Sequence, residues 1–326
     1  MTATDAALQV RDMRTWFAGS TGPVKAVDGV DLEVLRGQAL GIVGESGCGK
    51  SSLVRSILGI WPDPPLRYEG QVVVDGVDLM QLPPRERRQH LGTGVAVVLQ
   101  DPMRALNPVR RIDHQITEML TRRKGMQKRA ARARAGALLQ EVGIDDAELR
   151  LGQYPGQLSG GLRQRVAIAI ALSGDPSVLL ADEPTTALDV TVQAQILALF
   201  DELRARRGLA VVLISHDLEM VASFVDRVAV MYAGRIVEAA SPSELLRAPR
   251  MPYTRALLAA RPHLRAPGER LASIDGRPPN LGDLPVGCAF APRCSTSSPM
   301  CRAGSPTLTV ISPEHDVACF HPAEVS

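Results

Sequence analysis

Short apolar runs of strand length recur along the chain, and most are followed by a polar loop and a segment with helical spacing. Continuous runs such as Ala39–Val43 and Ala210–Ile214 are typical of strands buried on both faces of a sheet. Val30–Val34 instead alternates apolar and polar positions, as a half-buried strand does. Such runs predict strands at 8–10, 30–34, 39–43, 71–74, 95–99, 177–181, 210–214 and 227–231.

Apolar residues at helical spacing occupy the segments between these strands. They predict helices at 52–58, 112–120, 127–142, 163–172 and 190–206. Strands that alternate with helices indicate an α/β fold. The region from about 102 to 173 is almost entirely helical in pattern, so we expect it to be an inserted helical subdomain.

Composition sets limits on the kind of protein this is. The 326 residues suggest about two domains. With 37 basic and 35 acidic residues, the chain has no overall electrostatic bias toward nucleic acid or an acidic membrane. No apolar run approaches the roughly 20 residues of a membrane span, and residues 1–12 lack the pattern of a signal peptide. We therefore expect a protein that is neither secreted nor membrane-spanning by itself.

The segment after the third predicted strand has the sequence G-E-S-G-C-G-K-S, from Gly44 to Ser51, and a predicted helix follows it. Glycines at this spacing bring backbone N–H groups close to a phosphate, and the positive end of the helix dipole adds to the attraction. Lys50 would reach the β- and γ-phosphates, and Ser51 would offer its hydroxyl to Mg²⁺. The strand-loop-helix context favours a phosphate-binding P-loop over a glycine-rich turn.

Polar side chains stand where three other buried strands end. Gln100 follows one strand, the carboxylates Asp182 and Glu183 follow the next, and His216 comes just after the last. Ligand-contacting groups of α/β sheets lie at these carboxyl ends. Asp182 fits a Mg²⁺ ligand, and Glu183 would polarise the water that attacks the γ-phosphate.

A second feature suited to an anion lies in the helical region, at Leu158-Ser159-Gly160-Gly161, where a Ser-Gly-Gly turn opens an apolar helix. Taken alone, this turn is equally explained by Ser159 acting as a helix N-cap. Residues 122–134 are locally basic, but without interleaved aromatic residues a solvated helix face is favoured over nucleic-acid binding.

Taken in order, the P-loop, Gln100, the Ser-Gly-Gly turn, Asp182-Glu183, Asp189 and His216 resemble the ATP-binding-cassette (ABC) ATPases over roughly residues 8–245. The resemblance implies a P-loop NTPase core with a RecA-like subdomain, an antiparallel β subdomain and the inserted helical subdomain. It implies that Phe17 stacks on adenine and that Asp189 crosses a dimer interface. Ser159, Gly160 and Gly161 would touch the γ-phosphate of ATP on the opposite subunit.

The resemblance assigns three groups of site residues. Glu183, His216 and Gln100 would act in catalysis, and Ser51, Gln100 and Asp182 would hold Mg²⁺. The residues expected at the nucleotide are Phe17, Gly44, Glu45, Ser46, Gly47, Cys48, Gly49, Lys50, Ser51, Ser52, Ser159, Gly160, Gly161 and Asp189.

The proline-rich segment beyond residue 241 is expected to form short helices and loops with little core of its own. It holds four of the five cysteines within 32 residues: Cys288, Cys294, Cys301 and Cys319. In a reducing compartment such clustering indicates a metal or iron–sulfur site rather than disulfides. His315 and His321 flank Cys319, so a mixed Cys/His zinc site is an alternative.

The segments Met251–Leu258, Pro278–Leu281 and Gly287–Cys294 resemble the C-terminal extension of oligopeptide/dipeptide importer ATPases. That resemblance implies a [4Fe-4S] cluster on the four cysteines. It divides the chain into a nucleotide-binding domain, 1–245, and a small cysteine-containing extension, 246–326.

The function implied is an ATPase subunit that powers a binding-protein-dependent importer, on the cytoplasmic face of the cell membrane. Its expected partners are two membrane-spanning permease subunits, a second and different ABC ATPase chain, and an extracytoplasmic substrate-binding protein, with no nucleic acid. The alternatives are an importer of nickel or another small solute, and a soluble cassette ATPase of DNA repair or ribosome recycling. The single cassette and short helical insert argue against the last.

Overall fold

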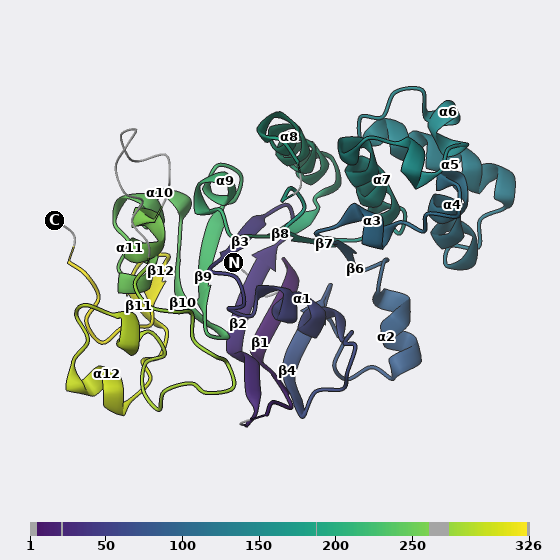
Figure 1. Cartoon of the computed structure of the whole chain (residues 1–326). Helices are drawn as coiled ribbons and strands as arrows, with labels where there is room; N and C mark the ends of the chain where they lie inside the picture. Colours follow the sequence, from purple (N-terminus) through teal and green to yellow (C-terminus); the bar gives the residue numbers. More distant parts are fainter. Residues whose placement is uncertain (1–4, 21, 187, 261–273, 325–326) are drawn as a thin grey trace. The chain divides into compact units, whose positions relative to one another are not determined.

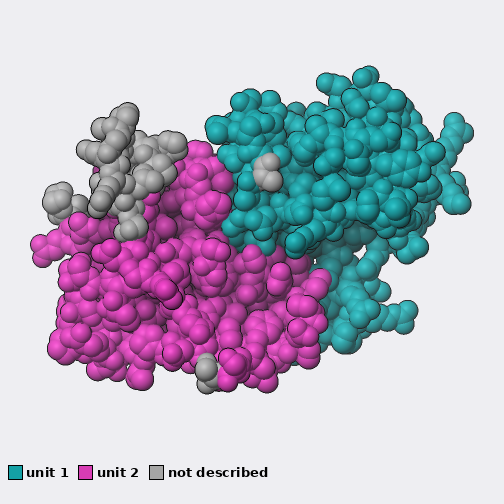
Figure 2. Space-filling view, in the orientation of Figure 1, with its two compact units in different colours: residues 1–9, 33–38, 72–214 teal, residues 10–32, 39–71, 215–326 magenta. Residues whose placement is uncertain are grey.

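The computed structural model describes residues 5–20, 22–186, 188–260 and 274–324. The chain folds into two compact units, which Figure 2 shows in different colours. Unit 1 contains residues 1–9, 33–38 and 72–214, and unit 2 contains residues 10–32, 39–71 and 215–326. No helix within the described ranges is both long enough and apolar enough to cross a membrane.

Three parallel strands form the sheet of unit 1, in the order β8-β7-β6. Their bounds are β6 Val95–Val98, β7 Val178–Asp182 and β8 Ala210–Ser215. Val98 pairs with Ala181, and Asp182 pairs with Ile214. Strands β7 and β8 are buried almost throughout, as continuous apolar runs require.

The sheet of unit 2 has the strand order β11-β12-β10-β9-β3. Its strands are β3 Ala39–Val43, β9 Arg227–Tyr232, β10 Arg235–Ala240, β11 Thr309–Ser312 and β12 His315–Val317. Strand β3 is parallel to β9, with Ile42 opposite Ala229, whereas β10 and β12 add antiparallel strands. Glu238 of β10 pairs with Val317 of β12.

The chain passes between the units within long antiparallel strands. These are β1 Ala6–Phe17, β2 Val24–Leu35 and β4 Arg67–Val74, whereas the short β5 Val77–Asp78 lies wholly in unit 1. In each unit, the parts of these strands that belong to it follow the order β2-β1-β4, and β5 pairs with β4 in unit 1. Buried and exposed positions alternate along β2, which confirms the half-buried strand predicted at 30–34.

Helices α4 to α7 of unit 1 gather beside one another, as Figure 1 shows, and they pack mainly through α5 and α7. Their bounds are α4 Ile112–Arg122, α5 Lys128–Glu141, α6 Ala147–Leu151 and α7 Gly160–Leu172, and the 3₁₀ helix η1 Pro155–Gln157 precedes α7. Ile116, Leu138 and Ile168 are fully buried within them. The other helices of unit 1 are α2 Pro84–His90, α3 Pro102–Ala105 and α8 Val190–Arg207.

Basic side chains of residues 122–134 form ion pairs on the surface of unit 1. Arg132 contacts Asp113 at 2.7 Å and Glu148 at 2.9 Å. These pairs are the expected behaviour of a solvated helix face.

The C-terminal part of unit 2 combines short helices with two strands. Its described helices are α10 Pro242–Arg247, α11 Pro252–Ala259, the 3₁₀ helix η3 Ala291–Arg293 and α12 Pro299–Ala303. The helices α1 Lys50–Leu58 and α9 Leu218–Ala222 also belong to unit 2. The expectation of helices and loops alone was wrong, because β12 pairs with β10 and so joins this segment to the main sheet of the unit.

Candidate functional site

The P-loop lies in unit 2 between β3 and α1, as predicted. Gly49 has φ +112°, and a Cβ there would lie 2.2 Å from the carbonyl oxygen of Ala26, so only glycine fits. Lys50 begins α1, is 5% exposed, and donates to the carbonyl oxygens of Gly44 (2.7 Å) and Glu45 (2.9 Å). Its ammonium is thereby held inside the loop, at a position suited to neutralising a phosphate group.

The other predicted residues of the loop lie at positions suited to a phosphate site. Ser46 and Gly47 are exposed, whereas Ser51 and Ser52 are half-buried in the first turn of α1. Cys48 lies with Sγ 3.8 Å from Lys50 Nζ. Burial raises the pKa of the Cys48 thiol although the Lys50 charge opposes the shift.

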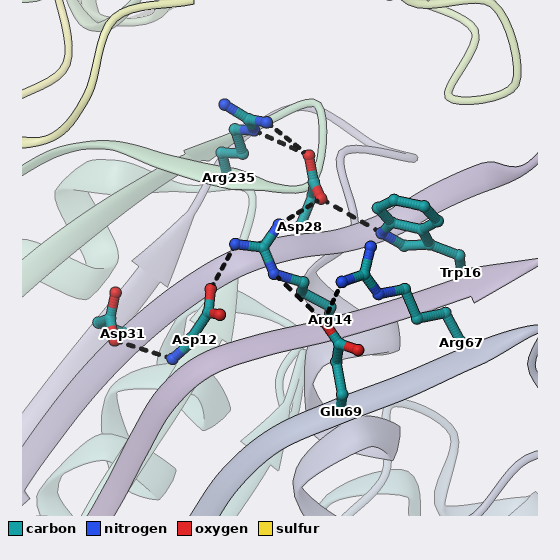
Figure 3. A network of polar contacts seen from close by, with 8 residues as sticks. All are labelled: Asp12, Arg14, Trp16, Asp28, Asp31, Arg67, Glu69 and Arg235. Atoms are coloured by element: carbon teal, nitrogen blue, oxygen red, sulfur yellow. Dashed lines mark hydrogen bonds and ion pairs between the residues drawn. The ribbon is translucent and has the colours of Figure 1, made fainter.

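Two aromatic residues, Trp16 and Phe17, end β1 in unit 2. The Trp16 ring contacts Arg67 at 4.5 Å and Lys25 at 4.7 Å from its centroid. Its indole N–H donates to Asp28 at 3.2 Å, within the polar network of Figure 3. Trp16 is therefore a structural residue, and Phe17 stays the predicted adenine contact.

Asp28 is the centre of that network. Its side chain is 3% exposed and receives hydrogen bonds from Arg14 at 3.3 Å and from Arg235 at 2.6 and 3.0 Å (Figure 3). Burial alone would raise the pKa of Asp28, but Arg235, Lys25 and Arg14 outweigh it and lower that pKa. The carboxylate therefore stays charged and joins β1 and β2 to β10.

In unit 1 the structure brings Gln100 and Glu183 together. Gln100 Nε2 donates to Glu183 Oε2 at 2.9 Å, and Thr186 Oγ1 donates to the same oxygen at 2.9 Å. Glu183 has a left-handed backbone, φ +47°, which costs free energy for a non-glycine residue and is often retained at functional sites. Asp182 is the half-buried last residue of β7.

The Ser-Gly-Gly turn and Asp189 lie on the surface of unit 1. Ser159 caps α7 by accepting from the Leu162 N–H, and Asp189 caps α8 by accepting from the Val192 N–H. A Cβ on Gly161 would come within 3.1 Å of Val192, so the starts of the two helices lie against each other. Ser159, Gly160 and Asp189 are exposed on the surface of the unit. His216 is exposed after β8 in unit 2.

The four cysteines of the tail line one cavity in unit 2. Its walls include Met251, Pro252, Phe290, Ala291, Cys288, Cys294, Cys301, Cys319 and His321. All four are free thiols. Burial, with the neighbouring cysteines adding to it, raises the pKa of Cys319 to about 11, and burial likewise raises the pKa of Cys288.

The two histidines that flank Cys319 in the sequence differ in their relation to the cysteine cavity. His315 is buried with Nε2 2.8 Å from Glu238 Oε1, and it does not line the cavity. His321 does line the cavity, where Nε2 lies 2.7 Å from Ser298 Oγ. Among the described residues, no three His, Cys, Asp or Glu side chains are grouped closely enough to hold a single metal ion.

Two residues at the loop were not predicted from the sequence. Tyr253 of α11 accepts the backbone N–H of Glu45 at 2.8 Å, and Arg293 of η3 forms an ion pair with the Glu45 side chain at 2.6 Å. They lie 208 and 248 residues from Glu45 along the chain, so no local sequence pattern could have indicated either contact.

Comparison with known proteins defines the class first. The fold is similar to two solved ABC cassettes. One is MJ0796 in a dimeric post-hydrolysis state bound to ADP and Pi, with TM-score 0.63 and 27% identity, covering 72% of this chain and 98% of that one. The other is cbiO1 of Clostridium perfringens, part of the transporter complex cbiONQ, with TM-score 0.62 and 27% identity, covering 74% and 90%. These likenesses confirm the predicted cassette fold.

Sequence relatives then define the branch. Residues 27–186 match the family described as ABC transporter, and residues 237–301 match the oligopeptide/dipeptide transporter C-terminal region. The dipeptide transport ATP-binding protein DppD of Bacillus subtilis is 44% identical over 96% of this chain and 94% of its own length. A probable peptide ABC transporter ATP-binding protein, y4tR of Sinorhizobium fredii, is 45% identical over 98% and 96%. The chain belongs to the family of ABC transporter ATP-binding subunits, in its oligopeptide/dipeptide branch.

Membership confirms the resemblance drawn from the motifs. The chain is an ATPase coupled to transport, and ATP with Mg²⁺ is what such an ATPase uses. Subunits of this kind work with permeases and a substrate-binding protein.

Proposed function

We propose that the chain hydrolyses ATP to power the import of oligopeptides or dipeptides. One observation supports this most: a full set of ATPase motifs is joined to a C-terminal segment that matches the oligopeptide/dipeptide transporter region. An importer of nickel or another small solute is the second candidate.

ATP would bind with its phosphates in the loop from Gly44 to Ser52 and its adenine against Phe17. The buried Lys50 ammonium, directed into the loop, supports this assignment. Ser51, Gln100 and Asp182 offer the oxygen ligands that Mg²⁺ prefers. The ion would neutralise charge on the phosphate oxygens.

Glu183 would accept a proton from the attacking water, with Gln100 and Thr186 holding its carboxylate in place. The shared 2.9 Å hydrogen bonds on Oε2 support this role. His216 would donate to the γ-phosphate. Ser159, Gly160, Gly161 and Asp189 would complete the site of a second subunit, which fits their exposure on unit 1.

The division into a nucleotide-binding domain of residues 1–245, with its helical subdomain at about 102–173, and an extension of residues 246–326 is part of this proposal. So is the composition of the complex: two permeases, a different ABC ATPase chain as partner, and an extracytoplasmic binding protein. The chain would lie peripherally on the cytoplasmic face of the cell membrane.

Purifying a tagged copy from detergent-solubilised membranes tests the proposed assembly. Two permease chains and a second ATPase are expected with it, identified by mass spectrometry, and peptide-loaded binding protein should stimulate ATP hydrolysis by the complex. Stimulation by nickel or another solute but not by peptide would select the second candidate. Co-purification with ribosomes or DNA and no permease would overturn both.

The tail cysteines would hold a [4Fe-4S] cluster. The convergence of Cys288, Cys294, Cys301 and Cys319 on one cavity supports this, since such a cluster takes one thiolate per iron. Zinc is the alternative occupant of the cavity. The cluster would supply cross-links that hold together a segment with little core.

Anaerobic purification should yield a brown protein with about four iron atoms per chain, as the proposed cluster type requires. Replacing Cys301 by Ser should reduce the iron content and bleach the visible absorption, because one thiolate ligand is lost. The matched control is Cys48→Ser, which lies in the P-loop and should leave iron unchanged. One zinc and no iron per chain would contradict the cluster.

A further inference from the structure

The second residue of the P-loop is held by a side chain from the cysteine-bearing tail. Arg293 grips the Glu45 carboxylate with two parallel hydrogen bonds, Nη1 to Oε2 at 2.6 Å and Nη2 to Oε1 at 3.1 Å. The Arg293 side chain is 6% exposed and that of Glu45 is 20% exposed. A bidentate pair with so little solvent access fixes both the position and the orientation of the carboxylate.

The remaining donors of Arg293 are also used, so the guanidinium is itself fixed. Nε donates to the carbonyl oxygen of Asp275 at 2.8 Å and Nη2 to that of Ile274 at 3.3 Å, while Nη1 lies 3.4 Å from the Tyr232 hydroxyl. Hydrogen bonding to Glu45 raises the pKa of Arg293 above its ordinary value despite burial.

The backbone of the same loop residue is held by Tyr253. The Glu45 N–H donates to the Tyr253 hydroxyl at 2.8 Å. The Tyr253 ring is fully buried, with its centroid 4.5 Å from that of Tyr232 and 5.4 Å from that of Phe290. This packing of the Tyr253 ring against two other aromatic rings fixes the position of its hydroxyl.

Both contacts come from residues beside the cysteine cavity. Arg293 lies directly before Cys294, and Tyr253 directly after Pro252, and both Cys294 and Pro252 line the cavity. Phe290, which packs on Tyr253, lines it as well. A change in the shape of the cavity would therefore move residues that directly contact the Glu45 side chain and the Glu45 backbone N–H.

The ion pair between Arg293 and Glu45 has an electrostatic reason, which follows from the charge of the ligand proposed for the loop. A free carboxylate on a loop that surrounds the polyanionic phosphates of ATP would repel them. Arg293 neutralises the Glu45 carboxylate and keeps it bonded toward the tail, so the backbone N–H groups of the loop are left to the phosphates.

We propose that Arg293 and Tyr253 are positioning residues for the P-loop, through which the state of the cysteine cavity controls the affinity of the chain for ATP. This inference rests on the proposed function in one respect, the P-loop as the ATP site, and holds whatever the cysteines carry. Because coupling between sites is reciprocal, ATP must in turn stabilise the cavity.

The first test is a set of variants at the contact, measured for MgATP affinity and for hydrolysis at saturating ATP. Arg293→Met should raise Kd and KM for ATP by about 10-fold, within the usual range of coupling between sites, while kcat changes less than about twofold. Tyr253→Phe, which loses only the accepting hydroxyl, should raise Kd by about threefold. Arg302→Met is the matched control, because Arg302 is an exposed tail arginine next to Cys301.

A double variant distinguishes the effect of an unpaired Glu45 charge from a general loss of folding. In the double variant Glu45→Gln with Arg293→Met the unpaired carboxylate is gone, so Kd should return to within about threefold of the original chain. A misfolded protein would show no such rescue. An Arg293→Met Kd within twofold of the original, or a double variant no better than the single one, overturns the proposal.

The reciprocal test measures how ATP binding changes the reactivity of the cysteines in the cavity. In the chain stripped of bound metal with a chelator, ATP should slow alkylation of Cys288, Cys294, Cys301 and Cys319, followed residue by residue with mass spectrometry, and Arg293→Met should abolish that protection. Cys48 is excluded from the comparison because ATP would cover it directly. Equal protection in both chains overturns the coupling, whereas an original chain that binds no ATP would instead overturn the P-loop assignment.

Discussion

Replacing Glu183 by Gln is expected to lower the rate of ATP hydrolysis by about 10²- to 10⁴-fold, the contribution of a general base, while MgATP still binds. The amide oxygen of Gln can accept the same hydrogen bonds from Gln100 Nε2 and Thr186 Oγ1 that Glu183 Oε2 accepts now, both at 2.9 Å. The substitution therefore keeps the geometry and removes the negative charge that polarises water. Phosphate release by the assembled transporter and equilibrium binding of MgATP measure the two effects.

The matched control is Glu202→Gln, which removes a carboxylate from the exposed surface of α8, where it pairs with Arg206 at 3.3 Å. Exposed pairs of this kind contribute little, so its hydrolysis rate should equal that of the original chain. Hydrolysis by the Glu183→Gln chain within threefold of the original would remove Glu183 from the catalytic role. Loss of MgATP binding would mean that Glu183 is needed for nucleotide binding rather than for the hydrolysis step.

The sequence predicts best those helices and strands whose buried positions are occupied by apolar residues in a recognisable local pattern. Strands β7 and β8 are continuous apolar runs because side chains cover both faces, and α7 carries a capping Ser159 that fixes its start. Strands β11 and β12 were missed because they are short, and β11 is largely exposed. The extended form of β12 depends on pairing with β10, a distant partner that no local pattern specifies, and β11 in turn pairs with β12.

The same division applies to the candidate site. Residues 44–51, Gln100 and Glu183 were predicted because phosphate binding and water activation demand particular residue types at fixed places on a strand-loop-helix unit. Arg293 and Tyr253 were not, since they act on Glu45 from more than 200 residues away. His315 was considered as a metal ligand from its closeness to Cys319 in the sequence. In the structure it is bonded to Glu238, and that contact depends on the pairing of β10 with β12.

Replacing Glu238 by Ala is expected to lower the free energy of unfolding by about 3–5 kcal/mol, the cost of removing one partner from a buried charged cluster. Glu238 is completely buried in β10. Its Oε1 accepts from the Arg250 N–H at 2.6 Å and lies 2.8 Å from His315 Nε2, and its Oε2 accepts from the Met251 N–H at 3.2 Å. Alanine would leave all three donors without this acceptor, and the hydrogen bonds of the Met251 N–H and of His315 Nε2 are buried ones.

Urea unfolding followed by circular dichroism measures this loss as a lower transition midpoint. Glu244→Ala, at an exposed position of α10, is the matched control and should stay within about 0.5 kcal/mol of the original chain. Glu238→Gln should fall between the two, because its amide oxygen can still accept while its NH₂ group meets the donor Met251 N–H. Equal stability of the Glu238→Ala and Glu244→Ala chains would show that the carboxylate does not hold this part of the fold. Since Arg250 and Met251 lead into α11, the helix that carries Tyr253, loosening Glu238 should also weaken ATP binding at the P-loop.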